Sequence, residues 1–158
     1  MSFLQNPPAI VVQRNTWWCW AACMEMLNRS HPSKFGTPVR TQAQWVALMQ
    51  ASPVAHVALN SHQGINMSYF PQFTNALGMQ FHGWIPPNST PDLAYAERKL
   101  HRSLLLGVIP SSGGNSHFVV IWGFDNQRVL YTDPTPGRGH SIASYSLVRQ
   151  QRLLIAWK

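Results

Sequence analysis

Residues 13–27, with the sequence QRNTWWCWAACMEML, constrain the fold of this chain more than any other segment. The eight residues after Cys19 contain no proline, glycine or β-branched residue and only one charge. This pattern predicts a mostly buried helix that begins at Cys19 and ends near residue 29. Asn15 and Thr16 stand just upstream, where helices are usually capped. A cysteine in the first turn of a helix faces unpaired backbone N–H groups and the positive end of the helix dipole, and both favour a thiolate. Cys19 is therefore a candidate nucleophile.

Gln13 lies six positions before Cys19, so its side-chain amide can reach the space above the sulfur. An amide N–H and the backbone N–H of a cysteine that starts a helix can together hold the oxyanion of an acyl-transfer reaction. This arrangement, with Cys-Trp-Ala at a helix start six residues after a glutamine, resembles the papain-like cysteine peptidases. Because the motif reads WCWAAC, it is more similar to their compact bacterial branch, the effector proteases of the AvrRpt2 type and the related bacteriocin-processing C39-type peptidases.

A thiolate nucleophile needs a general base, and histidine is the usual one near neutral pH. Of the seven histidines, only His117 stands at the start of a strongly apolar strand, HFVVIWGFD, after a loop rich in Ser and Gly. This segment is also similar to the histidine segment of the papain-like family, with Ser116 where glycine is commoner. Taken without the cysteine motif, His117 has an alternative interpretation as a strand-end residue that caps a loop.

The histidine in turn needs an acceptor that orients its ring, and the chain contains three aspartates. Asp133 ends the strand that is expected to pair with the strand of His117, so a hairpin would bring the two side chains together. An Asp-Pro pair after a strand is also similar to the bacterial family. Asp125 lies in the expected hairpin turn and suits local backbone bonding better. Asp92 suits the N-terminus of a helix.

The resemblance implies an α+β, papain-like fold in which N-terminal helices, including the nucleophile helix, pack on a C-terminal antiparallel β-sheet. It implies a single domain over residues 1–158 that acts as a cysteine peptidase without a cofactor or a metal. The catalytic residues would be Cys19, His117 and Asp133, with Gln13 as oxyanion donor. The expected partner is a protein or peptide substrate, and a monomer is expected. Family members of this size act as injected effectors or toxins, which adds a cognate immunity or inhibitor protein as a candidate partner.

Hydrophobic periodicity and turn signals predict the remaining elements. Helices are expected over residues 41–50, 67–77 and 92–106, the last of them closed by Gly107. Strands are expected over residues 79–84, 117–124, 128–132, 141–145 and 153–157.

The chain carries 12 Lys and Arg against 5 Asp and Glu, a formal charge of +7 that favours an acidic partner without selecting one. Two alternatives to a peptidase therefore stay open. The same triad could act on another amide, as a peptidoglycan amidase, a deamidase or an acyltransferase. A more remote alternative is a basic nucleic-acid-binding domain with an inert cysteine. The sequence contains no recognised nucleic-acid motif, so a nucleic-acid partner is not expected.

Cys23 follows Cys19 by about one helical turn, which is poor geometry for a disulfide. A zinc site would need about four ligands with paired spacings, so we expect Cys23 to be buried as a small apolar residue. The N-terminal residues do not have the pattern of a secretory signal, and no apolar run reaches the length of about 18 residues that a membrane span needs. The expectation is a secreted or injected effector without a classical signal peptide, or otherwise a cytoplasmic protein.

Overall fold

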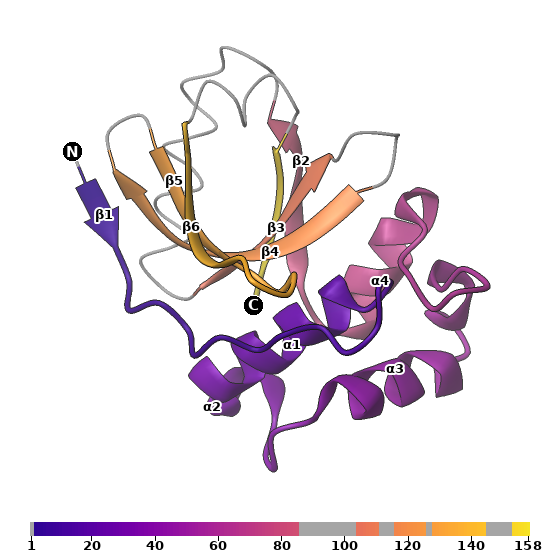
Figure 1. The fold of residues 1–158 in the computed structure, drawn as a ribbon. Helices are drawn as coiled ribbons and strands as arrows, with labels where there is room; N and C mark the ends of the chain where they lie inside the picture. Colours follow the sequence, from indigo (N-terminus) through magenta and orange to yellow (C-terminus); the bar gives the residue numbers. More distant parts are fainter. Residues whose placement is uncertain (1, 86–103, 111–115, 126–127, 145–152) are drawn as a thin grey trace.

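The computed structural model describes residues 2–85, 104–110, 116–125, 128–144 and 153–158 (Figure 1). The described helices come from the first half of the chain and lie together against an antiparallel β-sheet (Figure 1). The helices are α1 (Cys19–Ser30), α2 (Pro32–Phe35), α3 (Gln42–Ala51) and α4 (Phe70–Ala76), with the 3-10 turns η1 (His56–Ala58) and η2 (Met67–Tyr69). The strands are β1 (Ser2–Leu4), β2 (Gln80–Ile85), β3 (Leu105–Pro110), β4 (Ser116–Asp125), β5 (Arg128–Asp133), β6 (Gly139–Ser144) and β7 (Leu153–Trp157). The predicted α+β arrangement of N-terminal helices on a mainly C-terminal sheet is confirmed.

The sheet has the order β2-β7-β3-β4-β5-β6, and β1 adds to β4 outside this path. All neighbouring strands pair in the antiparallel sense. The inner strand β3 is an apolar run whose residues from Leu105 to Val108 are buried, as is typical of a strand covered on both faces. In this order β4 lies next to β5. The helix α1 packs on β4.

The nucleophile helix α1 lies between β4 and α3, and every residue from Cys19 to Asn28 is buried. The predicted helix and its burial are confirmed. The prediction that Asn15 or Thr16 caps it is wrong, because Trp18 is the N-cap residue and no side chain caps the helix. Asn15 instead forms the turn before it: its Oδ1 accepts a hydrogen bond from the N–H of Trp17, and its carbonyl accepts one from the N–H of Trp18.

The predicted helix over residues 41–50 is confirmed as α3, which starts one residue later. Thr41 caps it through a capping box with Gln44, in which each side chain bonds to the backbone N–H of the other residue. Trp45 and Met49 on its apolar face are buried, but Leu48, which the helical spacing places beside them, is 41% exposed.

The expected helix over residues 92–106 is wrong at its C-terminal end. Residues 105–110 form β3, and residues 92–103 lie outside the described part of the chain. Gly107 does not close a helix but pairs with Val119 inside the sheet. A Cβ atom at Gly107 would lie 2.7 Å from Cδ1 of Ile121 and 3.2 Å from Cγ2 of Val119. Close packing of neighbouring side chains over the strand therefore explains the glycine. The sequence alone does not distinguish such a glycine from one that ends a helix.

An aromatic cluster joins the helices to the sheet. Trp20 of α1 packs edge-on against Phe73 of α4, and Phe73 in turn contacts Phe118 of β4. Phe70 of α4 contacts both Phe73 and Phe118. Of the helices that the structure describes, none has the length and apolar character needed to cross a membrane.

Candidate active site

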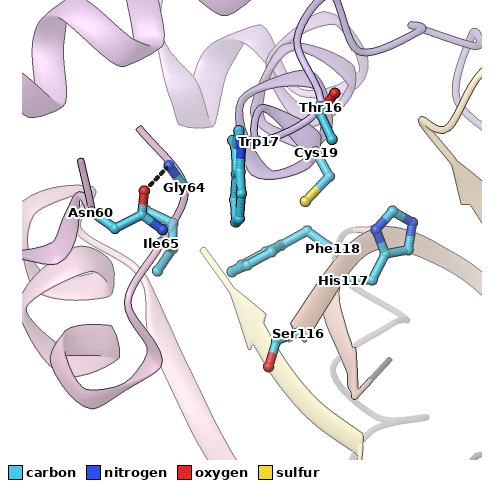
Figure 2. A pocket seen from close by; sticks show the side chains of 9 residues that line it. All are labelled: Thr16, Trp17, Cys19, Asn60, Gly64, Ile65, Ser116, His117 and Phe118. Atoms are coloured by element: carbon cyan, nitrogen blue, oxygen red, sulfur yellow. Dashed lines mark hydrogen bonds between the residues drawn. The ribbon is translucent and has the colours of Figure 1, made fainter. Parts of the chain in front are cut away.

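A cleft of about 380 Å³ opens where the start of α1 meets the start of β4 (Figure 2). Nine residues line it: Thr16, Trp17, Cys19, Asn60, Gly64, Ile65, Ser116, His117 and Phe118. Cys19 and His117, which the sequence predicted as catalytic residues, therefore face the same cavity from two elements almost one hundred residues apart.

Strand pairing brings His117 to Asp133. Because β4 and β5 are antiparallel, with Val120 opposite Thr132, the start of β4 lies beside the end of β5. The Nε2 atom of His117 lies 2.7 Å from Oδ1 of Asp133, a short contact of the charge-assisted kind. The side chain of Asp133 is 11% exposed and that of His117 is 25% exposed, so the ion pair is largely protected from screening by solvent.

Cys19 faces the same imidazole. Figure 2 shows its sulfur in the pocket, with the ring of His117 at one side, and a hydrogen bond with Cys19 helps to raise the pKa of His117. Since Nε2 is occupied by Asp133, Nδ1 is the ring nitrogen left for the thiol. The structure thus brings together all three residues of the predicted triad in the order thiol, imidazole, carboxylate.

The surroundings favour the charged forms of the histidine and the aspartate. Burial lowers the pKa of His117, but the hydrogen bonds with Asp133 and Cys19 and the charges of both groups outweigh it and raise this pKa to about 9. Burial raises the pKa of Asp133, but the hydrogen bonds from His117 and from Thr135 outweigh it and leave this pKa below its ordinary value. Around neutral pH the pair is therefore an imidazolium beside a carboxylate.

The raised pKa of His117 predicts how stability depends on pH. A group whose pKa is higher in the folded state stabilises the fold fully below its unfolded value of 6.5, and this contribution is lost as the pH rises through 9. We expect the free energy of unfolding, measured in urea, to fall between pH 6.5 and pH 9 in the wild type. The fall should be smaller in His117→Gln, which cannot titrate. An equally steep fall in this variant would mean that other groups cause it.

Thr135 is a site residue that sequence reasoning missed. Its N–H donates to Oδ1 of Asp133 at 2.9 Å, and its hydroxyl lies 3.3 Å from Nε2 of His117. A carboxylate that accepts from the N–H two residues later is an Asx turn, for which Asp-Pro-Thr is a suitable sequence. Thr135 therefore fixes the carboxylate of Asp133 in the orientation that meets His117.

The structure places Gln13 near the site, but its amide does not line the cleft. Its Nε2 donates to the backbone carbonyls of Asn15 and Thr16, at 3.1 and 3.0 Å. Its backbone N–H donates to the carbonyl of Pro134, directly after Asp133. The role of Gln13 as oxyanion donor stays a prediction, and it requires that Nε2 exchange one of these carbonyls for the substrate oxygen.

The buried side chain of Gln42 holds the backbone on both sides of Gln13. Its Nε2 donates to the carbonyl of Val12 at 2.8 Å, and its Oε1 accepts from the N–H of Arg14 at 3.0 Å. Gln42 is 2% exposed, so these bonds form in a protected environment where they are strong. Together with Pro134 they tie the segment before Cys19 to α3 and to the loop after β5.

Cys23 is completely buried in the core and has no part in the cleft. Burial, followed by the charges of Cys19 and Asp133, raises its pKa well above the ordinary value. Both cysteines are free thiols, and the expected burial of Cys23 as a small apolar residue is confirmed. Among the described residues, no three His, Cys, Asp or Glu side chains gather in a way that could hold a metal ion.

Comparison with known proteins defines the fold. No family model matches the sequence, and no curated protein matches it. Among solved structures, the peptidase domain of Streptococcus ComA, a bi-functional ABC transporter involved in a quorum-sensing pathway, superimposes with a TM-score of 0.59 at 17% identity, over 92% of this chain and 94% of that domain. The chain has the papain-like fold of the C39 peptidase domains.

Two further structures share this C39 peptidase fold. A Bacillus anthracis protein described as a C39-like peptidase matches with a TM-score of 0.59 at 10% identity, over 100% of this chain and 98% of the other. A double glycine motif protease from an AMS/PCAT transporter, solved with its leader peptide, matches with a TM-score of 0.51 at 16% identity, over 99% and 97% of the two chains. The predicted resemblance to compact papain-like peptidases is therefore confirmed at the level of the fold.

Proposed function

We propose that this protein is a cysteine peptidase that cleaves peptide bonds with Cys19 as nucleophile, His117 as general acid and base, and Asp133 as the residue that orients His117. The observation that carries the proposal is that Cys19 and His117 line one cleft, while Nε2 of His117 lies 2.7 Å from Oδ1 of Asp133 and leaves the other ring nitrogen for the thiol. A thiolate beside an imidazolium that a carboxylate orients is the arrangement that activates a sulfur nucleophile.

The reaction follows from these positions. The thiolate of Cys19 attacks the carbonyl carbon of the scissile amide, and His117 gives its proton to the amine nitrogen as the carbon–nitrogen bond breaks. The acyl group is left on sulfur as a thioester. A water molecule then loses a proton to the neutral imidazole of His117 and attacks the thioester, which releases the carboxylic acid and restores the thiol and imidazole pair.

The start of α1 supplies the first oxyanion donor in this proposal. Cys19 is the first residue of α1, and the first N–H groups of a helix have no partner within the helix. The oxyanion that forms next to the sulfur would therefore accept a hydrogen bond from the backbone N–H of Cys19. Gln13 is the predicted second donor, once its Nε2 turns from the carbonyls that it now binds.

A peptide is the substrate class that the fold supports best. The similar protease of the AMS/PCAT transporter was solved in complex with the leader peptide, and the cleft here is lined by both aromatic and small residues. By analogy, we propose that the substrate of this chain is a peptide segment in an extended conformation. An effector or toxin role, with a cognate immunity protein, is a further proposal that rests on the sequence resemblance alone.

The pairing of thiol and imidazole can be tested before a substrate is known. Iodoacetamide at pH 6 should alkylate Cys19 much faster in the wild type than in His117→Ala, by at least about tenfold, because the imidazolium stabilises the thiolate. Cys23 provides an internal control, since it is fully buried and should stay unlabelled in both proteins. Trypsin leaves both cysteines on one peptide, so the protein is digested with chymotrypsin, which cuts after Trp20, and mass spectrometry of the peptides then separates the two sites. Equal labelling of Cys19 with and without His117 would refute the proposed nucleophile.

A further inference from the structure

The wall of the cleft opposite His117 is formed by a short irregular segment, residues 59–65, which we call the wall loop. Figure 2 shows Asn60, Gly64 and Ile65 on one side of the pocket and His117 on the other, with Cys19 between them. A single β-bridge between Leu59 and Ile65 closes the loop at its base. No helix or strand holds its tip, so other contacts must fix the position of this wall.

The indole groups on both sides of the nucleophile bind one residue of the wall loop. The Nε1–H of Trp20 donates to the backbone carbonyl of Gln63 at 2.8 Å. The Nε1–H of Trp18 donates to the side-chain Oε1 of Gln63 at 3.0 Å. Trp20 is fully buried, so its N–H needs a protein partner. The two residues next to Cys19 in the sequence therefore both anchor on Gln63.

The backbone of Gln63 adopts a conformation that side chains seldom take. Its φ angle is 68°, in the left-handed region where residues other than glycine are uncommon. Such a conformation persists where surrounding contacts fix it, and it is common in ligand-binding segments. At Gln63 it turns the carbonyl toward Trp20 while the side chain reaches Trp18.

The third tryptophan of the motif contacts the residues on both sides of Gln63. The ring of Trp17 stacks on that of His62, with 4.9 Å between centroids and 13° between planes. A Cβ atom at Gly64 would lie 3.1 Å from Cε3 of Trp17 and 3.0 Å from Nδ2 of Asn60. The backbone of the wall loop thus approaches Trp17 as closely as a glycine allows, and any outward shift of the loop would widen the cleft.

We propose that Gln63 is a positioning residue that sets the width of the substrate cleft, because it ties the wall loop to the tryptophans that flank Cys19. The inference rests on the proposed function, since it assumes that a peptide lies in this cleft when Cys19 reacts. Gln63 does not line the cleft itself, and it acts through Gly64 and Ile65. Its loss should weaken the capture of a peptide and leave the chemistry of the thiol unchanged.

The test compares two alkylating probes of Cys19. Iodoacetamide is small and needs only the thiolate, whereas a set of peptidyl chloromethyl ketones must lie along the cleft to react. Gln63→Val is the disruptive variant, because a β-branched residue resists a positive φ. Gln63→Gly tolerates this φ and should therefore keep the backbone carbonyl directed toward Trp20, although it loses the side-chain bond to Trp18. Ser61→Ala, at an exposed position of the same loop, is the matched control.

We expect Gln63→Val to lower the second-order rate with the peptidyl reagents by about tenfold and the rate with iodoacetamide by less than about twofold. Gln63→Gly should keep most of the peptidyl rate, and Ser61→Ala should keep all of it. Retained iodoacetamide reactivity at pH 6 shows that the variants are folded at the site.

Several outcomes would overturn the inference. One such outcome is a Gln63→Val variant that lowers neither rate, and another is a variant that lowers both rates equally, which would indicate a general structural role. A wild type that iodoacetamide labels rapidly but that no peptidyl reagent alkylates would show that the cleft does not hold a peptide. Failure of the proposed function gives a different result, because the wild-type thiol would then show no dependence on His117 with iodoacetamide.

Discussion

Cys19→Ala should abolish peptide hydrolysis and leave the fold intact. The expected loss is at least about 1,000-fold, because removal of the nucleophile removes the covalent pathway and leaves only binding and oxyanion stabilisation. Hydrolysis can be followed with a library of quenched fluorogenic peptides, or with fluorescently labelled casein if the library contains no good substrate. The sulfur of Cys19 faces the cleft, so its removal in the alanine variant should not disturb the packing of α1.

The matched control for this prediction is Cys23→Ala, four residues later on the same helix. Cys23 is fully buried and does not line the cleft, so this variant should keep its activity. Equal loss in the two variants would show that the thiol at position 19 has no special role. Activity that survives Cys19→Ala would exclude Cys19 as the nucleophile.

Trp20→Ala should lower the free energy of unfolding by about 3–5 kcal/mol, the range measured for buried aromatic truncations. Trp20 is completely buried, packs edge-on against Phe73 at 5.7 Å and binds the carbonyl of Gln63. The truncation would leave a large cavity between α1 and α4 and an unpaired carbonyl in the wall loop. The measurement is urea unfolding followed by circular dichroism.

The variant Trp20→Phe serves as control, because it keeps most of the ring volume and loses the N–H that binds Gln63. Trp20→Phe should lower the free energy of unfolding clearly less than Trp20→Ala does. A loss below about 1 kcal/mol in Trp20→Ala would mean that the core around α1 collapses into the space and is not tightly packed. A large loss in Trp20→Phe, close to that of the alanine variant, would assign most of the energy to the hydrogen bond.

The structure links the stability of the core to the shape of the cleft. Trp20 lies in the aromatic cluster and also anchors Gln63, and its neighbour Cys19 lines the cleft. On the other side, Gln42 and Pro134 hold the segment around Gln13. The thiol is thus placed by a rigid helix, and the surfaces that a substrate would contact are placed by hydrogen bonds from that helix and its neighbours.

Local signals were sufficient to predict much of the fold. The helix that starts at Cys19 follows from a run of good helix formers. The helix α3 follows from apolar residues at three- and four-residue spacing, and the structure adds the capping box of Thr41 and Gln44 at its start. The hairpin of β4 and β5 follows from two apolar runs around a polar turn, which also explains why His117 and Asp133 could be paired in advance. Each of these features depends on residues close together in the chain.

Other features depended on contacts that the sequence does not reveal. The local sequence suggested that Gly107 ends a helix, but Gly107 lies in a central strand. Glycine suits this position because Ile121 fills the space that a side chain would occupy. The local sequence suggested that Asn15 caps the helix, but its side chain accepts a hydrogen bond from the N–H of Trp17 in the turn before α1. The bonds of Nε2 of Gln13 to its own loop were likewise not foreseen, because they depend on how residues 13–18 fold back.

The sequence by itself determined the nucleophile helix, the histidine strand and the aspartate at the end of its partner strand, because each is encoded by a short motif and strand pairing propagates from a local turn. Only the tertiary structure decided what faces Cys19 across the cleft. Residues 59–65 have no periodic pattern, and their position is fixed by the indole groups of Trp18 and Trp20, more than 40 residues earlier in the chain. Contacts over such separations arise from the packing of the whole core, and no local pattern in the sequence predicts them.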